Sequence, residues 1–336
     1  MRLPQFNFAP KIGIDLGTAR VRIWVEGVGQ YKDEPSCLSI NVQDGRVLAV
    51  GNQALKLKQK NAQLVWPIQT GQVADKKQVQ ALLKILLDQA WRPRILAQPI
   101  IAVSIPVSSS KEEKQTLSEL LFELGAQEVV TVAQPLAGML GSGVLSRDVS
   151  ASFGLAIGAG LVEAGVVSMG SVIKSVSNQR AGEWLSWQLQ AYLHRELAAE
   201  FVKEDVEQLL QTVGALYPGG KTAAEVVGKD LHTGQPKTFL IKGELLTPVV
   251  KVYAQGYLEL VQKLMSQLSP ALIQDCFERG LLIFGGAAKL QGLEKFLSQS
   301  LGMPVALVED AETAVQAGLV VVLQNLNEFK NQALSA

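Results

Sequence analysis

A pattern that occurs twice most constrains the fold of this chain. An apolar, strand-like run at residues 11–16 leads through a glycine turn into a second strand-like run at residues 21–25. The same order of strand, glycine turn and strand returns at residues 153–168, roughly 140 residues further along. At 336 residues the chain is also long for a single core. We therefore predict a duplicated α/β fold with two domains, each beginning with a short β-meander.

The first glycine turn carries residues that suit a phosphate group. Gly17 lets the backbone approach closely, Thr18 supplies a hydroxyl, and Asp15 could hold a hydrated Mg²⁺. The same residues also suit an ordinary β-hairpin in which Asp and Gly serve only the turn. Taken alone, residues 11–20 leave both interpretations open.

Charge and cysteine content exclude several classes of function. Lys plus Arg and Asp plus Glu both number 31, so no net charge attracts nucleic acid over a broad surface. The two cysteines and two histidines have neither zinc-site nor disulfide-framework spacing, and a reducing cytoplasm fits them. No signal-peptide pattern and no apolar window of about 20 residues is present. We expect a protein that is neither exported nor membrane-spanning.

Apolar periodicity predicts the remaining elements. We expect strands at residues 35–40, 46–50, 100–105, 129–132, 172–176, 281–284 and 305–308. We expect helices at residues 76–90, 111–124, 135–145, 184–193, 203–213, 242–267, 292 onward and 311–323. Serines at 108–110 are suited to cap the second of these helices. The tail at residues 1–10 and the polar end from residue 324 are expected to be loose.

Short motifs then occur in one order along nearly the whole chain. They are residues 13–19 (Gly-Ile-Asp-Leu-Gly-Thr-Ala), 33–36, 47–51, 71–75, 92–94, 124–129, 134–137, 229–237 and 285–287. In this order and spacing the sequence resembles the MreB family of bacterial actins, within the superfamily of actin, heat-shock chaperones and sugar kinases. The resemblance implies an actin-like fold with ATP and Mg²⁺ in a cleft between the two domains.

The resemblance also implies a domain organisation and partners. Domain I would comprise residues 1–148 and 315–336, with a small insert at about 30–75. Domain II would comprise residues 149–314, with an insert at about 182–243. MreB proteins assemble head to tail into protofilaments on the inner face of the cytoplasmic membrane and guide cell-wall synthesis. We therefore expect association with itself or a paralogue, contact with that membrane and the wall-synthesis machinery, and a role in cell shape.

The two phosphate loops that the resemblance implies are unequally preserved. The first keeps the family residues Asp15, Gly17, Thr18 and Ala19. The second, which in MreB reads Asp-Ile-Gly-Gly-Gly-Thr-Thr, here reads Ala156-Ile157-Gly158-Ala159-Gly160-Leu161-Val162. The metal-shell acid and both hydroxyls are gone, although the glycines can still bring backbone N–H groups to a phosphate. The second loop is expected to cradle a phosphate without coordinating a metal.

The catalytic position is also changed. Gln134 stands before Pro135 where MreB has its water-activating glutamate. An amide can orient a water but cannot accept its proton, and losing general-base help typically costs about 10²- to 10⁴-fold in rate. With Leu161 in place of a second water-positioning residue, we expect hydrolysis to be slow or absent.

The implied nucleoside pocket is partly eroded. On its helix the matching positions are Glu207, Leu210 and Thr212, and the last two replace a lysine and a glutamate. Phe284, which replaces a small hydroxyl residue, could stack on adenine or fill space. The wall that follows it is closer to the family pattern, and its implied nucleotide contacts are Gly285, Gly286, Ala287 and Ala288.

Two stretches are candidates for membrane contact, because MreB proteins use an N-terminal segment or a small apolar loop for this purpose. Phe6 and Phe8 lie in the first, and Trp91, Arg92 and Arg94 lie in the second. Trp beside two arginines suits the interface with anionic lipid, although Trp91 could instead pack against its own domain.

Three functions remain open from the sequence. The first is a membrane-associated filament protein with a degraded ATP site, which binds nucleotide weakly and hydrolyses it slowly or not at all. The second is a filament that hydrolyses ATP, using Asp15 and Gln134. The third is a non-polymerising scaffold of actin fold, of the kind found in cell-division or pilus assembly. A sugar kinase is disfavoured, because no acidic base stands in a sugar-pocket context.

Overall fold

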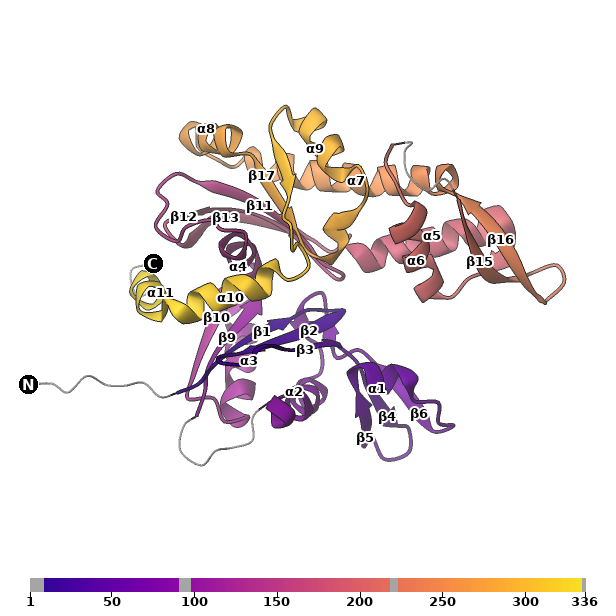
Figure 1. Cartoon of the computed structure of the whole chain (residues 1–336), viewed down its shortest axis with the longest axis horizontal. Helices are drawn as coiled ribbons and strands as arrows, with labels where there is room; N and C mark the ends of the chain where they lie inside the picture. The colour runs from indigo at the N-terminus through magenta and orange to yellow at the C-terminus, as the bar shows by residue number, and fades with distance from the viewer. Residues whose placement is uncertain (1–8, 91–97, 218–222, 334–336) are drawn as a thin grey trace, which may run out of the picture. The chain divides into compact units, whose positions relative to one another are not determined.

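The computed structural model describes residues 9–90, 98–217 and 223–333. The chain divides into two units, Met1–Leu145 with Thr313–Ala336, and Ser146–Glu312. We call them unit 1 and unit 2 (Figure 1). Each is built on a five-stranded sheet.

The sheet of unit 1 has the order β10-β9-β1-β2-β3. Strands β1, β2 and β3 form an antiparallel meander, whereas β9 and β10 join it in parallel. The strands are β1 (Lys11–Leu16), β2 (Arg20–Val25), β3 (Gly29–Pro35), β9 (Ile100–Ile105) and β10 (Glu128–Ala133).

Two helices cover one face of this sheet, α2 (Lys76–Ala90) and α3 (Lys111–Glu123) (Figure 1). Their apolar residues pack against alternate residues of β1 and β2 in one buried cluster. The start of α3 is fixed by a capping box between Ser110 and Glu113, as the serines before it predicted.

The opposite face is covered by α4 (Gln134–Gly141) and α10 (Ala314–Gln324), which cross with their backbones in contact. A Cβ at Gly141 would lie 1.9 Å from the carbonyl oxygen of Ala314, so no larger residue fits there. The close approach of α10 also brings Leu319 against Gly13 of β1. Glycine therefore allows the last long helix to return onto the first strand.

A small insert in unit 1 follows β3. It contains a three-stranded sheet of order β5-β4-β6 and a two-stranded hairpin. Its elements are β4 (Leu38–Asn41), β5 (Val47–Val50), α1 (Gly51–Lys56), β6 (Ala62–Val65), β7 (Ile68–Gln69) and β8 (Gln72–Val73).

The sheet of unit 2, of order β13-β12-β11-β17-β18, repeats the topology of unit 1. Its first three strands form an antiparallel meander, and β17 and β18 join in parallel. The strands are β11 (Ser152–Ile157), β12 (Val162–Ser168), β13 (Ser171–Asn178), β17 (Leu281–Phe284) and β18 (Val305–Leu307). The repeated meander confirms the predicted duplication.

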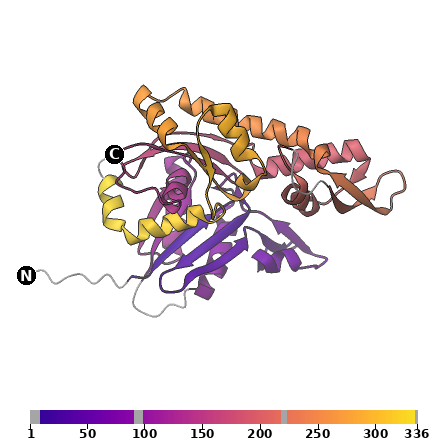
Figure 2. The ribbon, with the colours of Figure 1, turned by 45° about the horizontal axis from the view of Figure 1, so that its top comes forward.

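Helices of unit 2 pack on one face of its sheet and form a single apolar core with it. The insert of this unit ends in a hairpin that extends beyond α5 and α7 (Figure 2). The remaining elements are α5 (Gly182–Leu197), β14 (Ala199–Glu200), α6 (Lys203–Val213), β15 (Ala223–Asp230), β16 (Pro236–Lys242), α7 (Gly243–Met265), α8 (Pro270–Arg279), the 3₁₀ helix η1 (Gly286–Lys289) and α9 (Leu293–Leu301).

Some predicted boundaries were wrong. The strand expected at residues 35–40 is broken, because the N–H of Ser36 donates to the carbonyl of Ala19 and turns the chain away from the sheet. The end of the chain, expected to be loose from residue 324, contains α11 (Leu326–Ala333). The helix α8 was not expected, although Ser269 caps it and a proline follows at its first position.

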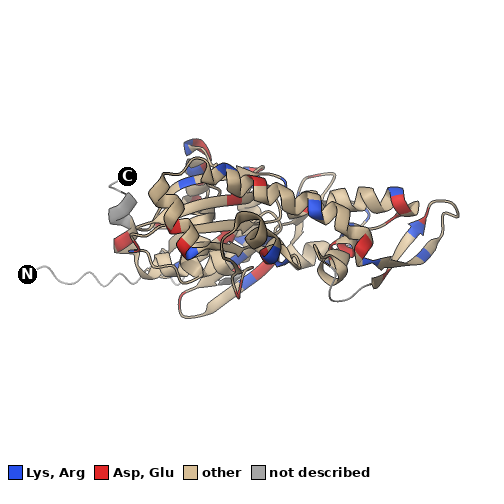
Figure 3. Cartoon of the chain, turned by 90° about the horizontal axis from the view of Figure 1, so that it is seen from above, with Lys and Arg blue, Asp and Glu red and all other residues tan. Residues whose placement is uncertain are grey.

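Surface charge is mixed, with Lys and Arg interspersed among Asp and Glu along the ribbon (Figure 3). No helix within the described residues is long and apolar enough to cross a membrane. Cys37 and Cys276 are both free and buried.

Candidate functional site

The turn after β1, which we call loop 1 (residues 17–19), is held in place by its neighbours. The N–H of Gly17 donates to the carbonyl of Arg20 at 3.0 Å, and a Cβ at Gly17 would lie 2.9 Å from that oxygen. The Oγ of Ser36 donates to the carbonyl of Gly17 at 2.7 Å. The N–H groups of Thr18 and Ala19 donate to no acceptor in the described part of the chain. Two backbone donors therefore remain for an anion.

Gly71 lies between loop 1 and Gln134, the predicted catalytic residue. The hydroxyl oxygen of Thr18 accepts a hydrogen bond from the N–H of Gly71 at 2.8 Å. A Cβ at Gly71 would lie 3.8 Å from the Nε2 atom of Gln134, the first residue of α4. Thr18 and Gln134, predicted from distant motifs, are thus neighbours of the same glycine.

Asp15 is buried, with 7% of its surface exposed, and both carboxylate oxygens have partners. The Oγ of Ser104 donates to Oδ1 at 2.8 Å and accepts from the N–H of Leu16 at 3.1 Å. A terminal guanidinium nitrogen of Arg22 lies 3.6 Å from Oδ2. Burial raises the pKa of Asp15, whereas Arg22 and the hydrogen bond from Ser104 oppose that rise.

Arg22 belongs to a row of charged residues across three strands. Sheet register places it opposite Asp15 on β1 and opposite Asp33 on β3. Its Nε lies 3.4 Å from Asp33 Oδ2, and Arg20 also donates to the backbone carbonyl of Asp33 at 2.8 Å. We did not predict Arg22 or Ser104 as site residues. The hairpin register would have found Arg22, because opposite positions around a turn share one face.

The turn after β11, which we call loop 2 (residues 158–160), has the same backbone as loop 1. The N–H of Gly158 donates to the carbonyl of Leu161 at 2.9 Å, and a Cβ at Gly158 would lie 3.0 Å from that oxygen. Across residues 9–90, 98–217 and 223–333, the N–H groups of Ala159 and Gly160 find no acceptor. Loop 2 can therefore offer backbone donors as loop 1 does.

The side chains next to loop 2 differ from those next to loop 1. Ala156 stands where Asp15 stands in unit 1, and its neighbours in register are Glu163 on β12 and Phe284 on β17. Phe284 and Glu163 are both fully buried. A ring without exposed surface has no face to offer a base, so Phe284 fits the space-filling interpretation.

Three segments of unit 2 meet at loop 2. The first N–H groups of α5 donate to it, from Gly182 to Gly158 at 3.0 Å and from Glu183 to Ala159 at 2.8 Å. A Cβ at Gly182 would lie 3.2 Å from the Cβ of Ala287. The backbone of Gly285 packs against Ile157, the residue before loop 2. The predicted wall Gly285, Gly286, Ala287 and Ala288 therefore adjoins loop 2.

Glu207 on α6 lies near the start of α5. Its Oε1 atom is 3.5 Å from the hydroxyl of Ser186 and 3.6 Å from the ammonium of Lys203. Burial raises the pKa of Glu207, and Lys203 opposes the rise. Leu210 packs against the core of unit 2, and the hydroxyl of Thr212 donates to the carbonyl of Gln208 at 2.8 Å. Neither replaces the charge of the family residue at its position.

The residues present do not fit a Mg²⁺ site. Among the described residues, no group of three or more His, Cys, Asp or Glu could hold a metal ion. Asp15 is engaged by Ser104 and Arg22, and Ala156 has no side-chain oxygen. A Mg²⁺ site usually combines waters and substrate phosphates with one or two carboxylates, and Asp15, the family acid that remains here, already faces Ser104 and Arg22.

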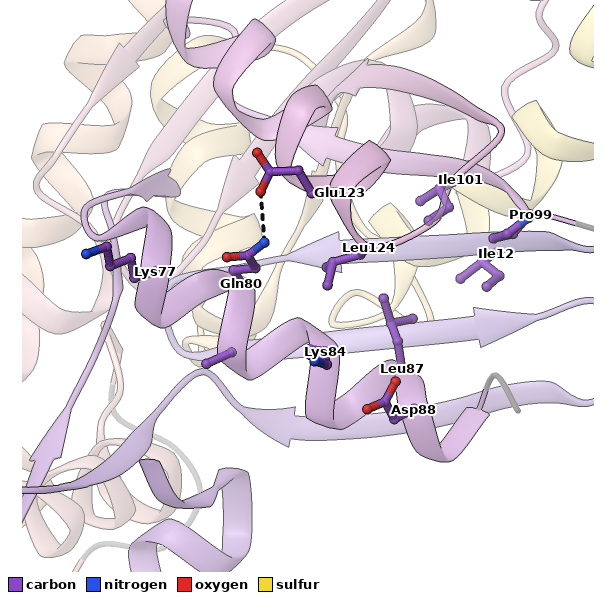
Figure 4. Close-up of a pocket in the computed structure, with 11 residues that line it drawn as sticks. Ile12, Lys77, Gln80, Lys84, Leu87, Asp88, Pro99, Ile101, Glu123 and Leu124 are labelled. Atoms are coloured by element: carbon purple, nitrogen blue, oxygen red, sulfur yellow. Dashed lines mark hydrogen bonds between the residues drawn. The ribbon is translucent and has the colours of Figure 1, made fainter. Parts of the chain in front are cut away.

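The membrane candidates Phe6, Phe8, Trp91, Arg92 and Arg94 lie outside the described residues. A groove of about 400 Å³ lies beside α2 and α3 in unit 1, and two of its lining residues, Gln80 and Glu123, are joined by a hydrogen bond (Figure 4). It contains no predicted nucleotide contact.

Residues 9–331 match the sequence pattern of the family described as MreB/Mbl protein. The chain belongs to this family. It is 29% identical over 331 residues to the cell shape-determining protein Mbl of Bacillus cereus. The aligned region covers 97% of this chain and 99% of that protein.

Solved structures confirm the actin-like fold. MreB5 of Spiroplasma citri bound to AMPPNP superposes with a TM-score of 0.90 at 23% identity, covering 97% of this chain and 99% of that one. MamK, solved as a double helical filament, superposes with a TM-score of 0.79 at 16% identity over 94% of this chain and 99% of that one. The MreB/Mbl chain described here is thus a divergent member with the family's fold.

Proposed function

We propose that this chain is a cytoskeletal filament protein of the MreB/Mbl type that binds an adenine nucleotide and hydrolyses it slowly or not at all. One observation carries the proposal: loops 1 and 2 have the same anion-binding backbone, but Ala156, Leu161 and Val162 around loop 2 supply neither a carboxylate nor a hydroxyl. Backbone donors are sufficient to bind phosphate, whereas hydrolysis also needs a base and an ordered water. In this proposal each loop can donate backbone N–H groups to a phosphate of the nucleotide.

Nucleotide binding has support from the relatives. MreB5 of S. citri, which shares this fold, is bound to AMPPNP. The direct test is a thermal-shift titration with ATP and with ADP, because a ligand that binds only the folded chain raises its melting temperature. We expect a shift that saturates below millimolar nucleotide. An unchanged melting temperature at several millimolar of either nucleotide would reject the proposal.

Filament formation and a role in cell shape follow from the family. MamK forms a double helical filament, and the B. cereus relative is a cell shape-determining protein. Pelleting and electron microscopy with ATP, with ADP and with anionic liposomes would test assembly. Filaments are the expected result. Their absence in every condition would favour the non-polymerising scaffold.

Membrane association at the inner face of the cytoplasmic membrane, beside the wall-synthesis machinery, completes the proposal. Its support is the sequence of two segments, with Phe6 and Phe8 in one and Trp91, Arg92 and Arg94 in the other. Trp91→Ser combined with removal of residues 1–9 is expected to abolish co-sedimentation with liposomes while leaving the circular dichroism spectrum unchanged. Undiminished co-sedimentation would reject this part.

A further inference from the structure

We propose that Arg22 is a built-in cation that takes the place of the divalent metal at loop 1, so that nucleotide binding does not depend on Mg²⁺. The inference rests on the proposed nucleotide binding. It concerns whether that binding needs a divalent metal ion beside Asp15. The cation and the acids that it faces all belong to unit 1.

The geometry leaves Asp15 unsuited to a hydrated metal. Its Oδ1 accepts from Ser104 at 2.8 Å, and its Oδ2 faces the Arg22 guanidinium at 3.6 Å. The side chains of Arg22 and Asp15 are only 11% and 10% exposed. A Mg²⁺ ion retains several waters, so a carboxylate that binds it through one of these waters must have an oxygen that faces solvent. Here the carboxylate points at an arginine.

The charges around Asp15 also make it unsuited to a divalent metal. The row across β1, β2 and β3 contains Asp15, Arg22 and Asp33, and Arg20 adds a second cation on Asp33. Asp15 therefore has a cation of the chain itself beside it, and Arg20 shares Asp33 with that cation. A dication placed beside Asp15 would also be repelled by a guanidinium a few ångströms away, and in a poorly solvated site that repulsion is strong.

Arg22 keeps its positive charge while it faces two acids. Its Nε is buried and makes no hydrogen bond within the described residues, although it lies 3.4 Å from Asp33. A guanidinium carries five N–H donors and stays charged at any physiological pH. Arg22, in the strand that follows loop 1, therefore supplies a permanent positive charge beside Asp15, and the backbone N–H groups of Thr18 and Ala19 remain for a phosphate.

Loop 2 supplies no replacement metal ligand in its own side chains. Ala156, Leu161 and Val162 stand where the resemblance implies an acid and two hydroxyls. The loss of metal ligands after β11 and the presence of a cation beside β1 are independent observations, and both favour binding without metal.

The experiment compares ADP binding in 5 mM MgCl₂ and in EDTA, by calorimetry and by thermal shift. For the full wild-type chain we expect dissociation constants that agree within about twofold. In Arg22→Met, which frees Asp15, we expect Mg²⁺ to tighten ADP binding by about tenfold or more, a difference of about 1.4 kcal/mol. Adding Asp15→Asn to Arg22→Met should remove that response, because the freed carboxylate carries it.

Two further variants complete the design. Arg20→Met removes the other arginine on Asp33 but leaves the Arg22–Asp15 pair, so it should bind ADP without metal as the wild type does. Arg22→Lys keeps the charge and serves if Arg22→Met does not fold; it should also be metal-independent. A wild-type chain that binds ADP only with Mg²⁺ would overturn this inference and leave the proposed function intact. No ADP binding in either medium would overturn both.

Discussion

Loops 1 and 2 have the same backbone and opposite surroundings. In each, a glycine N–H donates to the carbonyl three residues on, at 3.0 Å after β1 and 2.9 Å after β11. Beside loop 1 lies the polar row of Ser104, Asp15 and Arg22, linked by a hydrogen bond and an ion pair. Beside loop 2, Ala156 and the buried Phe284 occupy the positions of the aspartate and the serine, and the buried Glu163 occupies that of the arginine.

The difference shows that the shape and the chemistry of a phosphate loop can be lost separately. The turn needs only a glycine where a Cβ would meet a carbonyl oxygen, and both loops keep it. The chemistry needs particular side chains on the adjoining strands, and only unit 1 keeps them. A large apolar ring next to Ala156 then fills the space that a solvated acid would require.

The largest expected effect is in unit 2. Phe284→Ala should lower the free energy of unfolding by about 3–5 kcal/mol, because it leaves a cavity where the ring is fully buried. Phe284→Leu, which keeps most of the volume, should cost less than half as much. Urea denaturation of both variants measures this. A loss below about 1 kcal/mol for Phe284→Ala would show that the ring does not fill the space beside Ala156.

In unit 1 the corresponding substitution is Asp15→Ala, which lowers the free energy of unfolding by removing a charge. Asp15→Ala should cost about 3 kcal/mol in urea denaturation, because it leaves Arg22 buried with one partner fewer. Arg22→Met added to Asp15→Ala should recover part of the loss. If the two losses simply add, the residues are not coupled and the ion pair contributes nothing.

The two glycines test whether the turns are equivalent. Gly17→Ala and Gly158→Ala should each cost about 1–2 kcal/mol, because each new Cβ would lie within 3.0 Å of a carbonyl oxygen. Equal costs are expected. If one substitution is tolerated freely, the two loops do not share a backbone.

The smallest effect is a pH dependence of stability. Burial raises the pKa of Asp15 in the folded chain, so the folded state binds a proton more tightly than the unfolded state. Wild type should therefore gain stability relative to Asp15→Asn as the pH falls from 7 toward 4, and lose that gain as the pH rises through the folded pKa. In Arg22→Met the gain should be larger, because an opposing charge is gone. A pH-independent difference between wild type and Asp15→Asn would contradict the burial of this carboxyl group.

The sequence predicted the fold well because the fold depends on local signals. Alternating apolar runs, the serine cap at Ser110 and the repeated glycine turns are all readable from neighbouring residues. The errors lie where a tertiary contact decides. Ser36 breaks a strand by bonding to Ala19, and residues 326–333, which are mostly polar, form a helix that contacts α10.

The candidate site was predicted less completely. Asp15, Gly17 and Thr18 were found because they follow one another in a motif. Arg22 and Ser104 were missed because their role depends on which strands are neighbours, and β9 starts far along the chain. The pairing of Ala156 with Phe284 likewise becomes visible only in the register of β11 and β17.

Phosphate release from ATP tests the central claim most directly, namely that this chain keeps the loops of an actin-like nucleotide site without the chemistry of hydrolysis. The wild-type chain, saturated with ATP as judged by its thermal shift, should release phosphate no faster than buffer or only slowly above it, with and without Mg²⁺. Release as fast as that of a family member that keeps the glutamate, abolished by Asp15→Ala in a variant that still folds, would show that the chain is an active ATPase and contradict the account.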